Sequence, residues 1–307
     1  MKILYGTKEI HIDVTDICFT KLLNKNIVTI MPGDLNRASK FSDPVYGILK
    51  SVFLEYDDGV IKEVDDTKMI VIDTVNKSIR IRDINDELRE IHSKLKLNYG
   101  KFEDELPEQR LTYMYLTGNE KILEIGSNIG RNSVFIGNIL RNNNNNNFVT
   151  LESDSNIVRA VIINRDLNGM TFHIENAALS KRKLIQKGWD TIPSDELIEG
   201  FKWVNTLTFE ELKNKYNINF DTLVLDCEGA FYYILMDMPE ILDNIKLIIM
   251  ENDYWDFSKK KFVNEVLVKN NFYVDYVESG REIGARGPCM DFFFEVWKRK
   301  SIILGEI

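Results

Sequence analysis

The fold is decided by residues 121–133, which read KILEIGSNIGRNS. A short apolar run ends in an acid, a turn with two glycines follows, and the apolar residues after the turn are typical of a helix. Strand, glycine turn and helix form the first unit of a nucleotide-binding α/β domain. Gly126 suits backbone angles that other residues avoid. Gly130 lets the backbone approach a ligand closely. The free N–H groups at the start of the helix would face that ligand.

The glycine turn differs from the dinucleotide fingerprint G-x-G-x-x-G and follows the pattern E-x-G-x-x-x-G from Glu124 to Gly130. An acid on the strand just before the glycines suits a ligand with positive charge. S-adenosylmethionine carries an ammonium and a sulfonium and is such a ligand. The turn alone is a weak signal, because a glycine turn after a strand is often only a turn.

Two further strands are predicted after the first helix. Residues 148–152 form a strand that ends at Glu152, and an acid at this place in nucleotide-binding βαβ units bonds the ribose hydroxyls. The alternative is an exposed loop acid, and the glycine turn upstream favours the ribose role. Residues 172–174 form the next strand, and the small residues after Asn176 would let an adenine ring lie against the backbone.

Acids also end the fourth and fifth predicted strands. Residues 222–225 are continuously apolar, as in a parallel sheet covered on both faces, and Asp226 and Glu228 follow them. Glu251 ends the strand at 247–251. Carboxylates at this edge of a sheet can accept a hydroxyl proton or hold a metal. The alternative is that Asp226 and Glu228 cap the next helix.

The last two predicted strands, 272–277 and 291–297, are joined by a glycine-containing loop. They predict an antiparallel hairpin after the alternating units, which distinguishes a methyltransferase-type sheet from a dinucleotide-binding sheet. The predicted fold class is therefore α/β, with a Rossmann-like sheet that ends in a hairpin. Residues 181–203, which are basic and aromatic, are candidates to cover the site.

Short β-branched runs indicate a β-rich module in residues 1–85. Residues 86–104 are predicted to be a helical linker, and residues 105–307 the methyltransferase-type domain. The module has no catalytic constellation and is a candidate for substrate capture or for contact in a homodimer. Residues 39–50 are expected to be an irregular loop, because proline follows Asp43. The run Asn142–Asn147 is expected to be a mobile loop, and we assign no function to it.

Composition excludes some classes of protein. The chain has 307 residues, 44% of them hydrophobic, with a net charge of −9 and a pI of about 5.1. This acidic balance argues against nucleic acid as a partner. The three cysteines are far apart and form no zinc spacing or disulfide framework, so we expect reduced thiols and a cytoplasmic protein without a metal site. We see no signal peptide and no apolar run of membrane-spanning length.

Five motifs, taken in order, resemble the FkbM family of S-adenosylmethionine-dependent methyltransferases over residues 105–298. They are residues 124–130, Glu152, residues 176–180, residues 206–212 and residues 226–230. The resemblance implies a seven-stranded sheet and O-methyl transfer to a sugar, a glycan or a related small metabolite. It implies that the cofactor is held by Glu124, Gly126, Ser127, Asn128, Gly130, Asn132, Glu152, Ser153, Asn176, Ala177, Ala178 and Asp226. Asp226, Glu228 and Glu251 are the candidate catalytic residues.

Three alternatives stay open. A catalytically silent protein with the same fold is one, because Thr208 and Leu225 depart from the family on the acceptor side. A nicotinamide oxidoreductase is the second, although neither its fingerprint nor its catalytic residues can be placed. A nucleic-acid methyltransferase is the third, and the acidic charge disfavours it.

Overall fold

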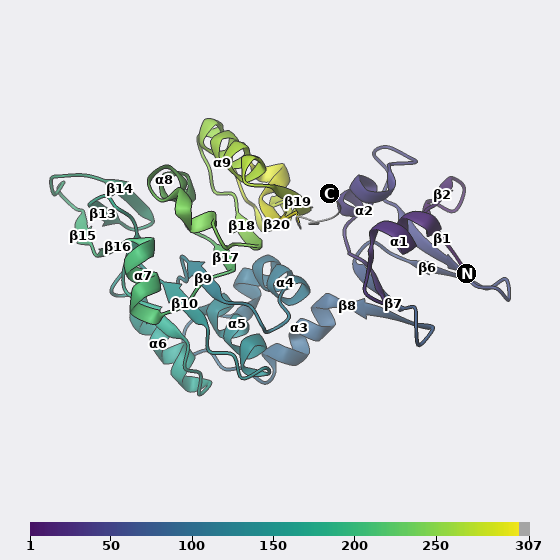
Figure 1. Cartoon of the computed structure of the whole chain (residues 1–307), viewed down its shortest axis with the longest axis horizontal. Helices are drawn as coiled ribbons and strands as arrows, with labels where there is room; N and C mark the ends of the chain where they lie inside the picture. Colours follow the sequence, from purple (N-terminus) through teal and green to yellow (C-terminus); the bar gives the residue numbers. More distant parts are fainter. Residues whose placement is uncertain (301–307) are drawn as a thin grey trace, which may run out of the picture. The chain divides into compact units, whose positions relative to one another are not determined.

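The computed structural model describes residues 1–300. The chain forms two compact units, a smaller one of residues 1–91 and a larger one that begins at His92 (Figure 1). Helix α3 (Ile84–His92) ends at the boundary between them. No helix of the described residues is both long enough and apolar enough to cross a membrane.

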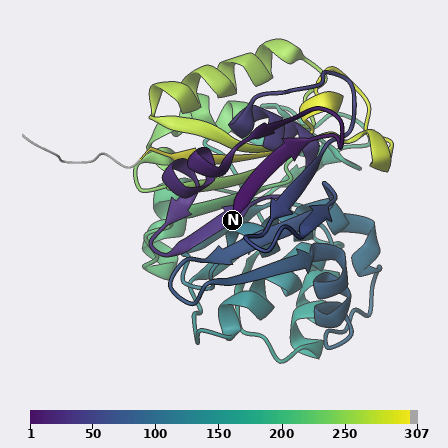
Figure 2. The same cartoon turned by 90° about the vertical axis from the view of Figure 1, so that its right-hand side faces the viewer.

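The smaller unit contains two four-stranded antiparallel sheets, whose strands face the viewer in Figure 2 (purple to blue). One sheet has the order β2-β1-β5-β6 and the other the order β3-β4-β7-β8. The bounds are β1 Lys2–Gly6, β2 His11–Asp13, α1 Thr15–Lys21, β3 Leu23–Asn24, β4 Ile27–Ile30, α2 Asp34–Phe41, β5 Ser51–Glu55, β6 Ile61–Val64, β7 Lys68–Asp73 and β8 Ser78–Asp83. Apolar side chains from both sheets form one core.

The predicted irregular loop at 39–50 was wrong at its start, because α2 continues to Phe41. The Phe41 ring is buried, 5.4 Å from the ring of Tyr5. Burial of this aromatic side chain in the core stabilises the last turn of α2. The proline at 44 does not prevent this turn, because it restricts only the residue directly before it.

The larger unit is built on a seven-stranded sheet with the order β11-β10-β9-β17-β18-β20-β19. The bounds are β9 Ile122–Ile125, β10 Phe148–Leu151, β11 His173–Glu175, β17 Thr222–Leu225, β18 Leu247–Glu251, β19 Phe272–Glu278 and β20 Phe294–Arg299. The first five strands along the chain run parallel, whereas β20 is antiparallel to both β18 and β19. The predicted fold class, including its terminal hairpin, is confirmed.

Helices cover both faces of this sheet (Figure 1). Helices α4 (Leu106–Tyr115), α5 (Arg131–Arg141) and α6 (Val158–Leu167) pack side by side on one face. Helices α8 (Phe231–Asp237) and α9 (Phe257–Lys269) pack together on the other, and α7 (Phe209–Tyr216) precedes β17. All four residues of β9 and of β17 are buried, which is why these strands are apolar without alternation.

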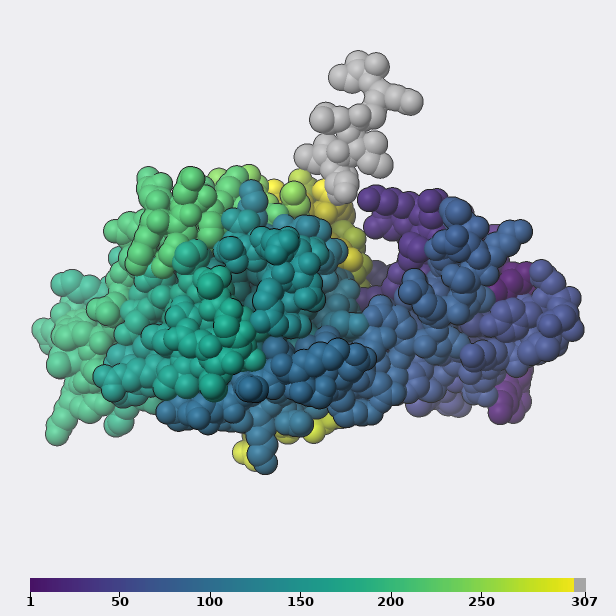
Figure 3. All heavy atoms as spheres, turned by 90° about the horizontal axis from the view of Figure 1, so that it is seen from below, coloured from purple at the N-terminus to yellow at the C-terminus, as the bar shows by residue number. Residues whose placement is uncertain are grey.

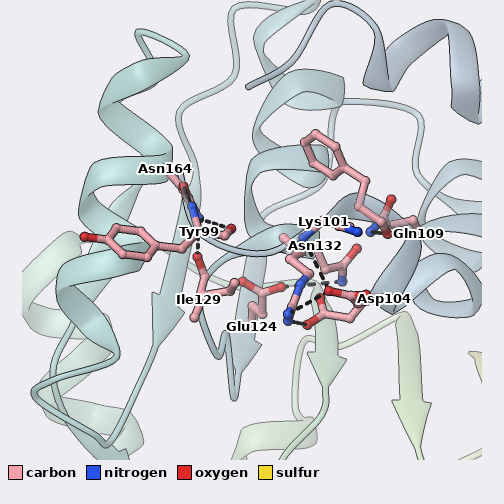
Figure 4. Close-up of polar contacts among 11 residues, drawn as sticks. Tyr99, Lys101, Asp104, Gln109, Glu124, Ile129, Asn132 and Asn164 are labelled. Atoms are coloured by element: carbon pink, nitrogen blue, oxygen red, sulfur yellow. Dashed lines mark hydrogen bonds and ion pairs between the residues drawn. The ribbon is translucent and has the colours of Figure 1, made fainter. Parts of the chain in front are cut away.

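The segment between α3 and α4 lies against α5 and α6, as the blue and teal surfaces of Figure 3 show. Asn164 on α6 fixes this segment: its Oδ1 accepts the Asn98 N–H at 2.8 Å, and its Nδ2 donates to the Ile129 carbonyl at 2.9 Å (Figure 4). One buried amide side chain thus holds the approach to α4 and the glycine turn together. A 3-10 turn, η1 (Phe102–Glu105), then leads into α4.

Residues 178–207 add two small sheets after β11. Strands β13 (Leu184–Lys187), β14 (Asp190–Pro193) and β15 (Lys202–Val204) form an antiparallel sheet, and β12 (Ala178–Leu179) pairs with β16 (Thr206–Leu207). The antiparallel sheet is tied to the loop after β10, because Gln186 Nε2 donates to Ser153 Oγ at 3.0 Å and Lys202 Nζ lies 2.8 Å from an Asp154 carboxylate oxygen.

The asparagine run is held by specific hydrogen bonds rather than being a featureless loop. Asn145 Nδ2 donates to the carbonyls of Gly118 and Glu120 at 3.1 and 2.7 Å, and Asn143 Nδ2 donates to the Thr117 carbonyl at 3.0 Å. The run therefore joins the end of α5 to the turn before β9. The sequence composition does not predict these hydrogen bonds, because it does not identify the backbone carbonyls that each amide side chain contacts.

Candidate functional site

Gly126 is a glycine because the neighbouring strand leaves no room for a side chain. Its φ is +90°, and a Cβ atom at this position would lie 1.7 Å from the carbonyl oxygen of Asp226. The N–H groups of Gly126 and Ser127 both donate to the Leu151 carbonyl, at 3.1 and 3.0 Å. The turn is thereby fixed between β10 and β17, at the carboxyl edge of the sheet.

Gly130 is required for packing within the chain, and the close approach of its backbone to a ligand stays a prediction. Its φ is +84°, and an added Cβ atom would lie 2.9 Å from Val161 Cγ1 on α6. The glycine therefore allows α5 and α6 to pack closely. The N–H of Asn132 at the start of α5 bonds the Glu105 carboxylate, so this N-terminus is in part occupied by the chain itself.

Glu124 is 2% exposed and lies against the start of α5. The hydroxyl of Ser133 donates to one carboxylate oxygen, and Asn132 Nδ2 lies 3.5 Å from the other (Figure 4). Burial raises the pKa of Glu124 to about 7, against the hydrogen bond from Ser133. The acid of the E-x-G pattern thus links β9 to α5 while facing a cavity.

A small cavity lies at the carboxyl ends of β9, β17 and β18, beneath η1 and α4. It is lined by Glu105, Glu108, Leu111, Glu124, Gly126, Ser127, Asn132, Val224, Leu225, Asp226, Ile249, Met250, Glu251 and Phe294. Of the predicted site residues, the structure brings Glu124, Gly126, Ser127, Asn132, Asp226 and Glu251 together here. The lining contains five carboxyl groups and no basic side chain.

The carboxyls of Glu108 and Glu251 are hydrogen-bonded to each other, so one of them holds a proton. Burial, followed by the negative charges of Asp226 and Glu108, raises the pKa of Glu251 to about 11. Burial raises the pKa of Glu108 to about 7, and burial together with Glu108 and Glu105 raises that of Asp226 well above its usual range. These pKa values are raised because ionised carboxyls would be desolvated and would repel one another here, and a bound positive charge would favour their ionised forms.

Glu228 lies outside this cavity, although it is only two residues from Asp226. It is exposed, with a φ of +51°, and its carboxyl hydrogen-bonds to that of Asp253. Although the residue is exposed as a whole, partial desolvation of its carboxyl, followed by the hydrogen bond and charge of Asp253, raises its pKa to about 8, with a smaller contribution from Asp190 on β14. Of the two acids at this strand exit, Asp226 therefore lines the cavity and Glu228 does not.

The residues predicted to bind the nucleoside lie at the same edge of the sheet, next to the cavity but outside its lining. Glu152 follows β10 and is buried, and one of its carboxylate oxygens accepts the Asp154 N–H at 2.7 Å. Asn176 Nδ2 donates to the Glu152 carbonyl at 2.9 Å, and Ala177 is buried beside it. Asn128, Gly130, Ser153 and Ala178 likewise lie outside the lining.

Two further acids line the cavity: Glu105, which the sequence prediction missed, and Glu108, whose place in the first turn of the helix after residue 106 allowed it to reach a ligand above the glycine turn. They are three residues apart around Pro107, and residues at this spacing share a helix face. Arg131 binds Glu105 Oε1 at 2.7 Å and Asp104 at 3.1 Å, which leaves Glu105 partly neutralised. The sequence did not indicate Phe294 as a site residue, because β20 lies at the site only through its position in the sheet.

No family model matches this chain, and no curated protein does. Among solved structures it is similar to a ribosomal protein L11 methylase from Lactobacillus delbrueckii subsp. bulgaricus (11% identity, 66% of this chain and 82% of that chain, TM-score 0.39). It is also similar to an O-methyltransferase from Bacillus cereus in complex with SAH (13%, 70% and 90%, TM-score 0.39) and to methyltransferase FkbM from Methylobacillus flagellatus KT (9%, 62% and 46%, TM-score 0.39). These likenesses are distant, and the strand order itself defines the class as a Rossmann-like class I methyltransferase fold.

Proposed function

We propose that the chain is an S-adenosylmethionine-dependent methyltransferase that methylates a hydroxyl group of a sugar, a glycan or a related small metabolite. The observation that carries this proposal is the carboxyl-lined cavity, which opens at the glycine turn on the edge where open α/β sheets bind ligands. The broader class is supported by the strand order of the sheet. The hydroxyl acceptor is supported by the motifs that resemble the FkbM family.

The residues at the glycine-turn end of the cavity fit the proposed cofactor. Ser127 is 3% exposed, and its Oγ has no hydrogen-bond partner among the described residues. Glu124 and Asp226 place carboxyl groups beside it, and a bound ammonium or sulfonium would favour their ionised forms. We expect Glu152, Asn176 and Ala177 to contact the nucleoside once the loop after β10 exchanges its internal hydrogen bonds for contacts with the ligand.

The bound cofactor would supply a methyl group on a sulfonium for direct displacement by the acceptor oxygen. Alignment of the hydroxyl accounts for most of the rate of such a step, and the walls formed by Leu111, Met250 and Phe294 exclude water from it. Glu108 is suited to take the hydroxyl proton, because its pKa of about 7 is close to neutral pH. Asp226 and Glu251 orient the hydroxyl.

Calorimetric titration with S-adenosylhomocysteine tests the proposal. Ser127→Leu places a branched side chain in the cavity and is expected to abolish binding while circular dichroism stays that of the wild type. Ser78→Leu, at an exposed position of the smaller unit, is the control and should bind normally. A folded wild-type protein that fails to bind the ligand, or that binds a nicotinamide dinucleotide instead, would refute the proposal. Binding without methyl transfer to hydroxylated acceptors would identify the silent alternative.

A further inference from the structure

The small antiparallel sheet of β13, β14 and β15 lies with one face on the loop after β10. Gln186 of β13 is paired with Thr191 of β14 and with Lys202 of β15, so these three side chains share that face. Gln186 Nε2 donates to Ser153 Oγ at 3.0 Å, and Lys202 Nζ lies 2.8 Å from an Asp154 carboxylate oxygen. Two polar contacts therefore fix the sheet over this loop.

Gln186 is buried at this contact with half of its amide group unused. The residue is 5% exposed, and its Oε1 has no hydrogen-bond partner within residues 1–300. An amide oxygen can accept two hydrogen bonds, and a buried oxygen that accepts none destabilises the folded state. Because an amide does not titrate near neutral pH, this oxygen remains an acceptor there. It therefore indicates a hydrogen-bond donor that the chain itself does not supply.

The loop that Gln186 contacts is where the nucleoside of the proposed cofactor is expected. An acid after the second strand of such a sheet bonds the ribose, so we expect the base beyond Glu152, beside Ser153 and Ala177. Asn176 Nδ2 donates to the carbonyls of Glu152 and Ser153, at 2.9 and 3.3 Å. The amide N–H groups of Asn176 are therefore used within the chain, whereas Gln186 brings an acceptor without a partner to the same loop.

We propose that Gln186 selects the nucleobase of the cofactor, with its Oε1 accepting a hydrogen bond from the amino group at position 6 of adenine. The inference rests on the proposed function and adds a specificity-determining residue from outside the motifs of the glycine turn. The base enters between the small sheet and the loop, and the hydrogen bond from Gln186 to Ser153 is exchanged for contact with the ligand. A base without the amino group leaves the buried oxygen unpaired and is rejected.

S-adenosylhomocysteine and its 6-deamino analogue, in which hydrogen replaces the amino group of the base, are matched probes for calorimetric titration. We expect the wild type to bind S-adenosylhomocysteine about tenfold more tightly than the analogue, from one hydrogen bond to a buried acceptor. Gln186→Met keeps the length of the side chain without the amide and should bind the two ligands equally. Lys187→Met, at the next and exposed position on the opposite face of β13, is the control and should keep the preference.

Labelled glutamine provides a second measurement on the wild-type protein, which does not depend on the folding of a variant. The chain has two glutamines, Gln109 and Gln186, so carbon-13 at the side-chain carbonyl gives one signal from each. Gln109 is the internal control, because its Nε2 donates to the Phe102 carbonyl at 2.9 Å and its Oε1 lies 2.6 Å from His92 Nε2. We expect S-adenosylhomocysteine to shift the Gln186 signal and not that of Gln109, and the analogue to shift it less.

Three results would overturn the inference: equal affinity of the wild type for the two ligands, a preference that survives in Gln186→Met, or a Gln186 signal that S-adenosylhomocysteine leaves in place. In each of them S-adenosylhomocysteine still binds the wild type. Failure of the proposed function is different, because that ligand then does not bind at all, so the two failures are distinguishable.

Discussion

Replacing Gly126 by alanine tests whether the glycine turn is fixed by the neighbouring strand. The added Cβ atom would lie 1.7 Å from the Asp226 carbonyl oxygen and 2.7 Å from its carbonyl carbon. Both are backbone atoms at the end of β17, so the clash cannot be relieved by rotating a side chain. The end of β17 must therefore move away from β9, which breaks the contact between the Asp226 N–H and the Ile125 carbonyl.

The expected loss of stability in Gly126→Ala has two contributions. A residue with a side chain at a φ of +90° costs about 1–3 kcal/mol. Overpacking against buried backbone costs about 1–3 kcal/mol more. We therefore expect Gly126→Ala to lower the free energy of unfolding by about 4 kcal/mol. Gly169→Ala is the matched control, because Gly169 has a φ of +59° with no atom within 4 Å of the added Cβ, and should cost about 1 kcal/mol.

Urea denaturation followed by circular dichroism and by tryptophan fluorescence measures both variants, and S-adenosylhomocysteine titration measures the site. Gly126→Ala should also weaken binding of that ligand, since Asp226 lines the cavity. Equal destabilisation in the two variants would show that strain in the turn, rather than contact with β17, explains the glycine.

Three further predictions concern buried polar groups. Because burial raises the pKa of Glu251 from 4.5 to about 11, the folded state keeps a proton that the unfolded chain releases. Stability towards urea should therefore be greatest below about pH 4.5, fall as the pH rises towards about pH 11, and fall less in Glu251→Gln. Lys260 is 0% exposed and forms an ion pair with Glu295, so Lys260→Met should lower the free energy of unfolding by about 3 kcal/mol because it leaves the Glu295 charge buried without a partner. Adding Glu295→Leu should restore most of this loss, and a single variant as stable as the wild type would contradict the prediction. Asn145→Ala removes two hydrogen bonds to backbone carbonyls and should lower the free energy of unfolding, measured by thermal denaturation, by about 1–2 kcal/mol. Asn142 is exposed, so Asn142→Ala should leave stability unchanged, and equal melting temperatures of the two variants would contradict the role assigned to the run.

The sequence predicted the parts of the fold that depend on local pattern. Continuous apolar runs at 122–125 and 222–225 marked buried parallel strands, and the glycine turn between the first strand and α5 marked the carboxyl edge. Parallel strands of one sheet place their carboxyl ends together, so acids that end successive strands met at one edge as expected. Glu124, Asp226 and Glu251 line a single cavity for this reason.

The remaining features depend on contacts between distant residues. Gly130 is required by Val161 on α6, which no local pattern shows. Glu228 has a left-handed backbone conformation and faces Asp253, although sequence proximity placed it beside Asp226. Glu105 enters the cavity because η1 packs against the start of α5, and such packing is set by the tertiary structure. The short strands β13, β14 and β15 carry too few residues for a clear alternation.

Hydrogen–deuterium exchange with and without S-adenosylhomocysteine tests whether the cofactor binds at the glycine turn and the end of β17, because it reports where the ligand lies and requires no activity. We expect slower exchange on binding at residues 124–132, 152–154 and 226–228, with little change in residues 1–83. Protection confined to the smaller unit, or to surfaces away from the glycine turn and the end of β17, would contradict the account.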